Sequence, residues 1–179
     1  MGLWRLNAAG WVLLEPADLP RVVDLSLRAW EPVFTSLRTV LGDEVFQRLY
    51  PDWRSDQERA VTATCTSTLM NATVADEAGA PVGFVAFAAD PATRLGVIEM
   101  LAVDPNRQGA GIGSALTSFA LRALRDAGMH VAMVETGGDP GHAAARRTYE
   151  KAGCTLLPIA RYFRSLDRVE PGDSLGSTP

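Results

Sequence analysis

The residues with the clearest chemical potential form a glycine-rich run, Gln108-Gly-Ala-Gly-Ile-Gly-Ser114. The run follows an apolar stretch typical of a strand and precedes a stretch with helical spacing. Backbone N–H groups at the start of a helix lack intrahelical partners and carry partial positive charge, and glycines let an anion approach them. We therefore expect a pyrophosphate cradle, built from Gln108, Gly109, Ala110, Gly111, Ile112, Gly113 and Ser114.

Two other interpretations of this run stay open. An ordinary glycine-rich turn would serve structure alone. A dinucleotide-binding fingerprint would use Gly109-x-Gly111 together with Glu135, which ends the next expected strand, where an acid could bind a ribose. Against the fingerprint, a long loop precedes the first glycine, Ser114 stands where a third glycine or alanine belongs, and only 44 residues follow Glu135. The chain has no GxxxxGK[ST] sequence, so a P-loop is not expected.

Composition places the chain among ordinary globular proteins. It has 179 residues, 47% hydrophobic and 21% charged, and a formal net charge of −4, which argues against a general nucleic-acid-binding protein. Cys65 and Cys154 are far apart and outside any CxxC pattern, which favours reduced thiols over a metal site or disulfide. Without an apolar leader or a run of about 18 apolar residues, we expect a cytoplasmic protein with no membrane partner.

The elements that must position the glycine run follow from hydrophobic spacing. Residues 16–71 are expected to be mostly helical, with Pro32 interrupting the first helix. Strands are expected at 11–15, 72–76, 81–89, 95–103, 130–136, 155–159 and 161–166, with helices at 114–127 and 141–152. This order predicts a mixed α/β sheet in a single domain over residues 11–168, with residues 1–10 and 169–179 as flexible ends.

Two motifs in this order resemble the GNAT acyltransferases. The segment Gln108–Gly113 fits the superfamily's Q/R-x-x-G-x-G/A motif. The helix that begins near His142 is similar to a second motif of the superfamily. In that motif a helix carries first an Asn, then an Ala and then a Tyr, and it ends at a Gly followed by an aromatic residue. Ala145, Tyr149 and Gly153 match that motif, whereas His142 replaces the Asn and Cys154 replaces the aromatic residue.

The resemblance implies both a fold and a ligand. The fold is α/β of the α+β type: a mixed, mostly antiparallel sheet, flanked by helices and splayed between its fourth and fifth strands. The ligand is acetyl-CoA, used as a co-substrate. By the family pattern, the strand end Leu101, Ala102 and Val103 would pair with the pantetheine arm, and a free N–H there would polarise the thioester carbonyl. His142, Ala145 and Tyr149 would complete the coenzyme site.

Three side chains are candidates for proton transfer. Tyr149 lies where the family often has its general acid, and it shares a helix face with Ala145 at i, i+4. Glu99 lies in an apolar strand run, on the face expected to carry Leu95, Val97, Leu101 and Val103, and burial there would raise its pKa towards that of a base. Glu135 is the alternative base. The alternative for Tyr149 is a tyrosine that only packs against its neighbours or the coenzyme. The alternative for Glu99 and Glu135 is a carboxylate at a surface or sheet edge with no part in catalysis.

The acceptor is expected to be a primary amine on a small molecule. The aromatic residues of the helical part, Trp30, Phe34, Tyr50 and Trp53, could border it, although such residues more often belong to a core. A protein acetyltransferase and a non-catalytic acyl-CoA sensor are the alternatives. His130 and His142 are the only histidines and no HExxH occurs, so no metal is expected. The protein would act as a monomer or a homodimer.

Overall fold

The computed structural model describes residues 11–166. The flexible ends expected at 1–10 and 169–179, and the last two residues of the expected domain, lie outside this range. The elements are β1 (Trp11–Leu13), α1 (Leu19–Leu49), α2 (Trp53–Thr66), β2 (Asn71–Glu77), β3 (Ala80–Asp90), β4 (Leu95–Val103), α3 (Ile112–Asp126), β5 (Val131–Val134) and α4 (Ala143–Lys151). Short 3-10 turns lie at Pro16–Asp18, Pro105–Arg107 and Pro140–His142.

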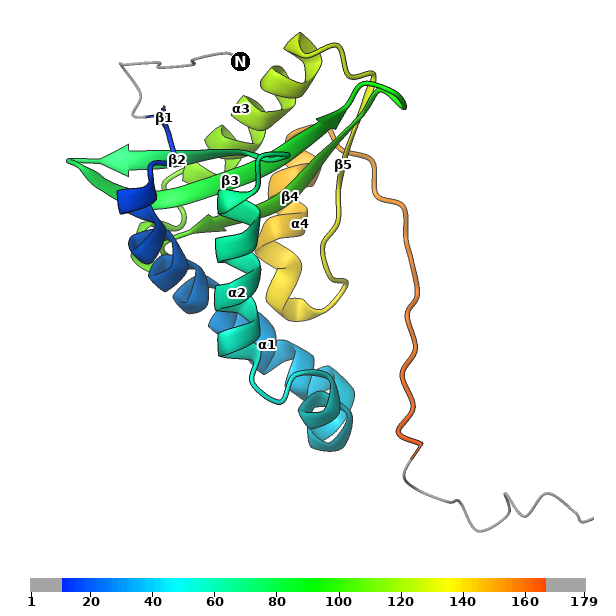
Figure 1. Cartoon of the computed structure of the whole chain (residues 1–179). Coiled ribbons are helices and arrows are strands. Elements are labelled where there is room, and N and C mark those ends of the chain that lie inside the picture. The colour runs from blue at the N-terminus through cyan, green and yellow to red at the C-terminus, as the bar shows by residue number, and fades with distance from the viewer. Residues whose placement is uncertain (1–10, 167–179) are drawn as a thin grey trace, which may run out of the picture.

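The described strands form one mixed sheet in the order β1-β2-β3-β4-β5 (Figure 1). Neighbours are antiparallel from β1 to β4, whereas β4 and β5 are parallel. A parallel pair needs a crossover connection, which α3 supplies. The expected mixed, mostly antiparallel sheet flanked by helices is therefore confirmed.

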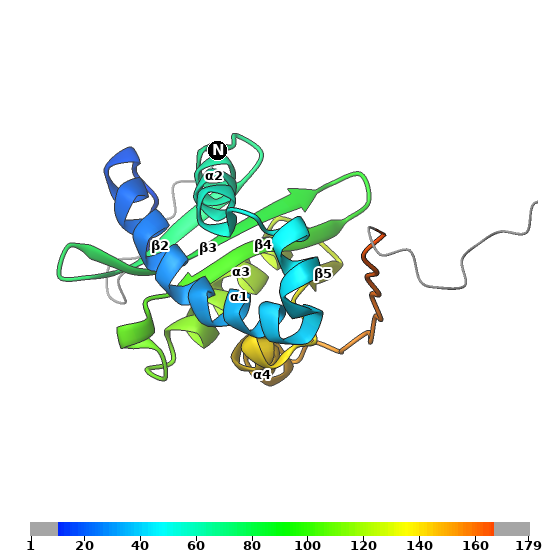
Figure 2. The same cartoon turned by 90° about the horizontal axis from the view of Figure 1, so that it is seen from below.

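Helices cover both faces of the sheet. On one face, α1 and α2 bury Val22, Leu25 and Val61 against Val74 and Phe84 of the sheet. On the other face, α3 packs an apolar stripe that includes Leu116, Ala120 and Leu124. Figure 2 shows α1 and α2 crossing in front of the sheet with α3 behind it. Each helix thus buries the apolar stripe that its 3.6-residue period creates.

Helix α1 differs from the sequence expectation. Pro32 lies inside the helix and does not interrupt it. Its fixed φ fits helical geometry, so the helix continues with one missing N–H donor. The departure from helical dihedral angles comes instead at Gly42, which has φ 75° and ψ 158°. The kink therefore lies ten residues beyond the expected position, where a glycine can adopt positive φ without penalty.

A bulge interrupts β4 at Glu99. Ala86 of β3 pairs with Met100, but the next residue, Phe87, pairs with Ile98, so Glu99 has no partner. One extra residue shifts the side-chain alternation of a strand by one. Accordingly, Ile98 and Val103 both belong to the core beside α3, while Ala102 belongs to the core beside α1. The expectation that Leu95, Val97, Glu99, Leu101 and Val103 share one face is therefore wrong.

The last two expected strands, 155–159 and 161–166, are also wrong. Between α4 and Asp167 the described residues form no strand, and the described sheet ends at β5. A β-strand requires a hydrogen-bonded neighbour in addition to suitable side chains. The composition of this segment favours a strand, but none of the described strands lies beside it.

Candidate functional site

A cavity of about 530 Å³ opens where β4 and β5 part. Its walls come from five elements: α1, the second half of β4, the loop into α3 with the start of α3, the end of β5, and α4. The crevice at the carboxyl ends of parallel strands is a common position for ligand sites in α/β proteins.

The parting of the strands leaves an unpaired backbone edge. The β4–β5 ladder stops at the pair Ile98–Val134, although β4 continues to Val103. From Glu99 to Val103 the strand has no strand neighbour on its β5 side. The divergence begins at the bulge, because the extra residue bends β4 just where pairing with β5 ends. An extended ligand could bind to this edge as a strand would.

The start of α3 provides free amide donors beside this edge. Gly111 is the N-cap, with φ 84°, a left-handed conformation that favours glycine. The first α-helical bond runs from the N–H of Ala115 to the carbonyl of Gly111 at 3.0 Å. The amides of Ile112, Gly113 and Ser114 therefore have no intrahelical acceptor. Nothing lies within 4 Å of where a Cβ on Gly111 would be, so the space beside it is open.

Two contacts hold the loop between β4 and α3. Arg28 of α1 donates two hydrogen bonds to Asp104, at 3.0 and 2.9 Å. This guanidinium holds the pKa of the Asp104 carboxyl below its usual value. The side-chain amide of Gln108 donates to the carbonyl of Val103 at 3.2 Å. Arg28 and Asp104 are far apart in the sequence, so no local spacing could have revealed this pair.

A second network fixes the loop between β5 and α4. Asp139 accepts hydrogen bonds from the Gly141 N–H, at 2.9 Å, and from the His142 ring; its side chain is only 6% exposed. Burial by itself raises the pKa of Asp139, but the bonds from Ser36 and His142 outweigh it and lower the pKa. Gly141 packs directly on α1, where a Cβ would lie 2.7 Å from the Ser36 Cβ. The network thus ties the 3-10 turn before α4 to α1, beside the cavity that Gly141 and His142 line.

Tyr149 is the candidate acid that α4 brings to the cavity. Burial, with a smaller effect of nearby Cys154, raises the pKa of its hydroxyl to about 12. The hydroxyl therefore stays protonated at neutral pH and can donate a hydrogen bond. Ala145 lies one turn earlier on α4 and lines the same cavity.

Both candidate bases also line the cavity, but neither is buried. Glu99 is exposed, so the expectation from the sequence that this side chain is buried is wrong. The bulge removes Glu99 from the regular alternation of β4. Glu135 is 71% exposed at the side chain, and it lies 3.5 Å from Arg161.

The cavity brings together nearly all of the residues singled out in the sequence. Of the candidate site residues, all except Ala110 line it. Among the four aromatic candidates, Trp30 lines the cavity, whereas Phe34 packs against Trp53 with ring centroids 4.2 Å apart and against Tyr50 at 5.4 Å. The sequence reasoning missed the wall residues Ala29, Pro32 and Val33 of α1, which carry no chemical signature.

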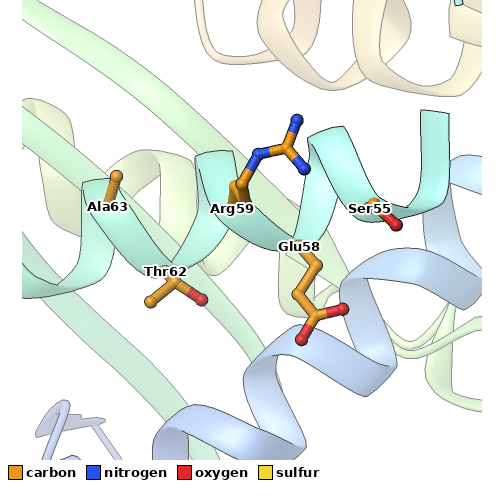
Figure 3. A pocket seen from close by; sticks show the side chains of 5 residues that line it. All are labelled: Ser55, Glu58, Arg59, Thr62 and Ala63. Atoms are coloured by element: carbon orange, nitrogen blue, oxygen red, sulfur yellow. The ribbon is translucent and has the colours of Figure 1, made fainter. Parts of the chain in front are cut away.

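Another hollow lies along α2 (Figure 3). Its lining residues are Ser55, Glu58, Arg59, Thr62 and Ala63, all from that one helix. Glu58 and Arg59 are exposed, and Arg59 forms an ion pair with Asp56. This hollow contains none of the candidate site residues. Among residues 11–166, no helix is long and apolar enough to cross a membrane, and no three metal-ligating side chains group together.

The fold and the cavity together define the class of protein: a splayed mixed sheet with a glycine loop and an unpaired strand edge facing one cleft. Residues 29–154 match the Acetyltransferase (GNAT) family, and the chain belongs to this family. Acetyl-CoA is the acyl donor of this family.

Curated relatives resemble this chain over part of their length. A mycothiol acetyltransferase of Sanguibacter keddieii is 43% identical over 68 residues, covering 38% of this chain and 21% of the relative. A mycothiol acetyltransferase of Nocardiopsis dassonvillei is 36% identical over 119 residues, covering 64% and 32% respectively. The chain thus spans about a fifth to a third of the length of these relatives.

Solved structures share the fold at low sequence identity. The ribosomal-protein-S18-alanine N-acetyltransferase of Escherichia coli has a TM-score of 0.62 and 20% identity, with 88% of this chain and 84% of that chain covered. A ribosomal-protein-alanine N-acetyltransferase from Brucella melitensis has a TM-score of 0.56 and 18% identity, with 87% of this chain and 99% of that chain covered. At these identities the likeness shows the fold alone.

Proposed function

We propose that this chain transfers an acetyl group from acetyl-CoA to a primary amine by direct attack through a tetrahedral intermediate. One observation carries the proposal. The unpaired edge Glu99–Val103 and the free amides at the start of α3 face the same cavity, so one extended ligand with a pyrophosphate could engage both.

The coenzyme would bind along these two features. The amides of Gly111–Ser114 would receive the pyrophosphate, whose charge also suits the positive end of the α3 dipole. Arg107 and Lys151 line the same cavity and would add positive charge. The pantetheine arm would pair with Leu101, Ala102 and Val103, and a free N–H of this edge would polarise the thioester carbonyl. His142, in the 3-10 turn before α4, and Ala145 of α4 would contact the arm.

The departing thiolate needs a proton donor, and we assign this role to Tyr149. Tyr149 lines the cavity from α4, and its hydroxyl is neutral at pH 7. As the tetrahedral intermediate collapses, the C–S bond breaks and its electron pair moves to sulfur. A hydrogen bond from the tyrosine strengthens as that charge develops.

The attacking amine must lose a proton, and we assign Glu99 as the acceptor, with Glu135 as the alternative. Glu99 supports this role because the bulge places it where the strand edge becomes free. Its exposure leaves room for a water between carboxylate and amine. Glu135 is the weaker candidate because it lies at the end of β5, beyond the point where the two strands part, and its carboxylate already has a partner in Arg161 at 3.5 Å.

We infer a small-molecule acceptor from the mycothiol acetyltransferase relatives, together with the apolar wall that Trp30, Pro32 and Val33 give the cavity. A protein acceptor is the alternative, suggested by the names of the structural neighbours. The two alternatives differ in the size of the acceptor that must fit beside α1 and α4, which both line the cavity.

A thiol-release assay tests the proposal. Purified protein is incubated with acetyl-CoA and, in separate reactions, with a panel of small primary amines or with peptides bearing a free N-terminus or lysine. Amine-dependent release of CoA is the expected result, with the small amines preferred. Preference for peptides would favour the protein-acetyltransferase alternative. Acetyl-CoA binding without turnover on any acceptor would favour a sensor and contradict the proposed activity.

A further inference from the structure

A carboxylate–imidazole pair beside the cavity has no assigned role in proton transfer. The ring of His142 bonds to Asp139 through Nδ1. The side chain of Asp139 is 6% exposed and that of His142 is 19% exposed. Asp139 also accepts hydrogen bonds from the Ser36 side chain and the Gly141 N–H, and its backbone carbonyl accepts one from Arg146 at 2.8 Å. A carboxylate held by three donors has one orientation, and it fixes the orientation of the imidazole that it contacts.

This pair determines which ring nitrogen of His142 can accept a proton. Burial opposes ionisation of Asp139, but hydrogen bonds from Ser36 and His142 outweigh it and lower the pKa, so the carboxylate is charged at neutral pH. A charged carboxylate can only accept, so Nδ1 carries the proton and Nε2 of the neutral ring is the acceptor. Nε2 forms no hydrogen bond within residues 11–166, where no buried side-chain nitrogen lacks a partner, so this atom is accessible.

The turn that carries His142 packs on the α1 wall of the cavity. The Gly141 N–H donates to the Ser36 hydroxyl at 2.9 Å, and a Cβ on Gly141 would lie 2.9 Å from the Cα of Val33. Val33 belongs to the apolar wall that we assign to the acceptor. His142 and Tyr149 lie on one face of α4, two turns or about 10 Å apart along the axis, and both line the cavity. His142 is therefore at the acceptor end of this face.

The proposed reaction leaves one proton without an acceptor. A primary amine of ordinary basicity, such as a lysine side chain with a pKa of about 10.4, is an ammonium at neutral pH. Its nitrogen loses one proton before it can attack, and a second after it has bonded to the carbonyl carbon. Glu99 accounts for the first proton only. Since the CoA sulfur takes up one proton, each turnover releases one proton to solvent.

We propose that His142 accepts the second proton and that Asp139 is its positioning residue, an inference that rests on the proposed acetyl transfer. In the tetrahedral intermediate an N–H bond of the attacking nitrogen breaks, its electron pair stays on nitrogen, and the proton binds to Nε2. The Asp139 carboxylate stabilises the imidazolium that forms. Water removes this proton as the products leave. In the wild type the transfer follows the slower loss of the first proton, so it limits the rate only when His142 is replaced.

His142→Asn gives the first test, because the second GNAT motif has Asn at this position. The variant should bind acetyl-CoA with wild-type affinity in calorimetry, while its turnover number at saturating substrates falls about 10²-fold. The matched control is His130→Asn, which should keep the wild-type turnover number, because this other histidine contacts Arg94 and does not line the cavity. Turnover of His142→Asn within about threefold of wild type would overturn the proposal. If the wild type itself releases no CoA with any amine, the proposed function fails as well.

Asp139→Asn tests the positioning role. An amide at this position can donate to Nδ1, which would move the ring proton of His142 to Nε2 and remove the proton acceptor. The turnover number should fall as far as in His142→Asn, and the double variant should be no slower than either single variant, because the two residues act as a unit. Far-UV circular dichroism checks that all variants are folded. Losses that multiply in the double variant would refute the pairing.

The basicity of the acceptor separates the two proton transfers. The most active amine of the panel is compared with an analogue that carries fluorine beside the amino group and is neutral at pH 7. The loss of rate in Glu99→Gln should shrink with the analogue, because its nitrogen has no first proton to lose. The loss in His142→Asn should persist, because the second proton leaves either amine after attack. If the loss in His142→Asn disappears with the analogue, His142 accepts the first proton and the proposal is overturned.

Discussion

Replacing Tyr149 with phenylalanine tests the chemistry assigned to the cavity. The change removes one hydroxyl oxygen from a ring on α4 and leaves the ring itself. Because the side chain is only partly exposed and its shape is preserved, the free energy of unfolding should change by less than about 1 kcal/mol. The coenzyme dissociation constant should change little, because the main coenzyme contacts are assigned to the strand edge and the glycine loop. The turnover number should fall.

The pKa of Tyr149 indicates how its hydroxyl can act, and therefore how far the turnover number should fall in Tyr149→Phe. With a pKa of about 12, the Tyr149 hydroxyl is neutral in all but about one molecule in a thousand at pH 9. A free thiol has a pKa of about 8.5, so complete proton transfer from this tyrosine to a free thiolate is uphill by about 5 kcal/mol. Tyr149 would therefore act as a hydrogen-bond donor whose proton moves only as charge builds on sulfur. A donor of this kind contributes about 10²- to 10³-fold to the rate, or about 3–4 kcal/mol.

The assay is thiol release under saturating acetyl-CoA and amine, with coenzyme affinity measured separately by calorimetry. Tyr50→Phe is the matched control, because Tyr50 packs against Phe34 and Phe46 and does not line the cavity; its turnover should stay at the wild-type level. Wild type and Tyr149→Phe should also share any alkaline decline in rate below about pH 10, since the tyrosine ionises above that range. Turnover of Tyr149→Phe within about threefold of wild type would refute the donor role.

Three further predictions concern the loops and the base. Gly111→Val should abolish coenzyme binding, because φ 84° costs a branched residue about 1–2 kcal/mol and the new side chain would enter the open space at the cradle. The control Gly113→Ala should bind coenzyme normally, because its Cβ would make an ordinary 3.7 Å contact with Val103. Equal coenzyme affinity of the two variants in calorimetry would contradict the cradle. Arg28→Gln should lower the free energy of unfolding by about 1 kcal/mol at pH 7, a pair energy kept small because Arg28 is 40% exposed, and should weaken coenzyme binding. Because Arg28 lowers the pKa of Asp104, the ion pair stabilises the fold above the usual carboxyl pKa of 3.8, and this stabilisation is lost as pH falls through the pKa of Asp104 in the folded protein. The free energies of unfolding of wild type and variant should therefore converge in acid. A difference between them that stays constant with pH would argue against the ion pair. Glu99→Gln should lower the rate and remove the acidic limb of its pH profile while Glu135→Gln keeps that limb; the reverse pattern would transfer the base to Glu135.

Local patterns in the sequence predicted the parts of the site that lie on one continuous segment. The glycine run was placed correctly between a strand and a helix, because free amides and positive φ are properties of a single turn. Tyr149 and Ala145 were placed on one face of α4, because helical spacing is also local. The splay between β4 and β5 followed from the family resemblance and appears as the early end of their ladder.

What the sequence could not predict depends on contacts between distant segments. The bulge at Glu99 is a property of the pairing between β3 and β4, and it moved that carboxylate out of the expected buried face. The Arg28–Asp104 and Ser36–Asp139 contacts join α1 to loops that follow it by many residues. Residues 155–166 have the side chains of a strand, but no described strand pairs with them.

Thermal denaturation with acetyl-CoA, with CoA and with NAD in separate samples tests the central claim most directly. A ligand at about 100 times its dissociation constant adds about 2.7 kcal/mol of stability, which for a chain of this size raises Tm by about 5–10 °C. The account predicts this rise with acetyl-CoA and with CoA, and none with NAD. A rise with NAD alone would contradict it and would restore the dinucleotide interpretation of the glycine run.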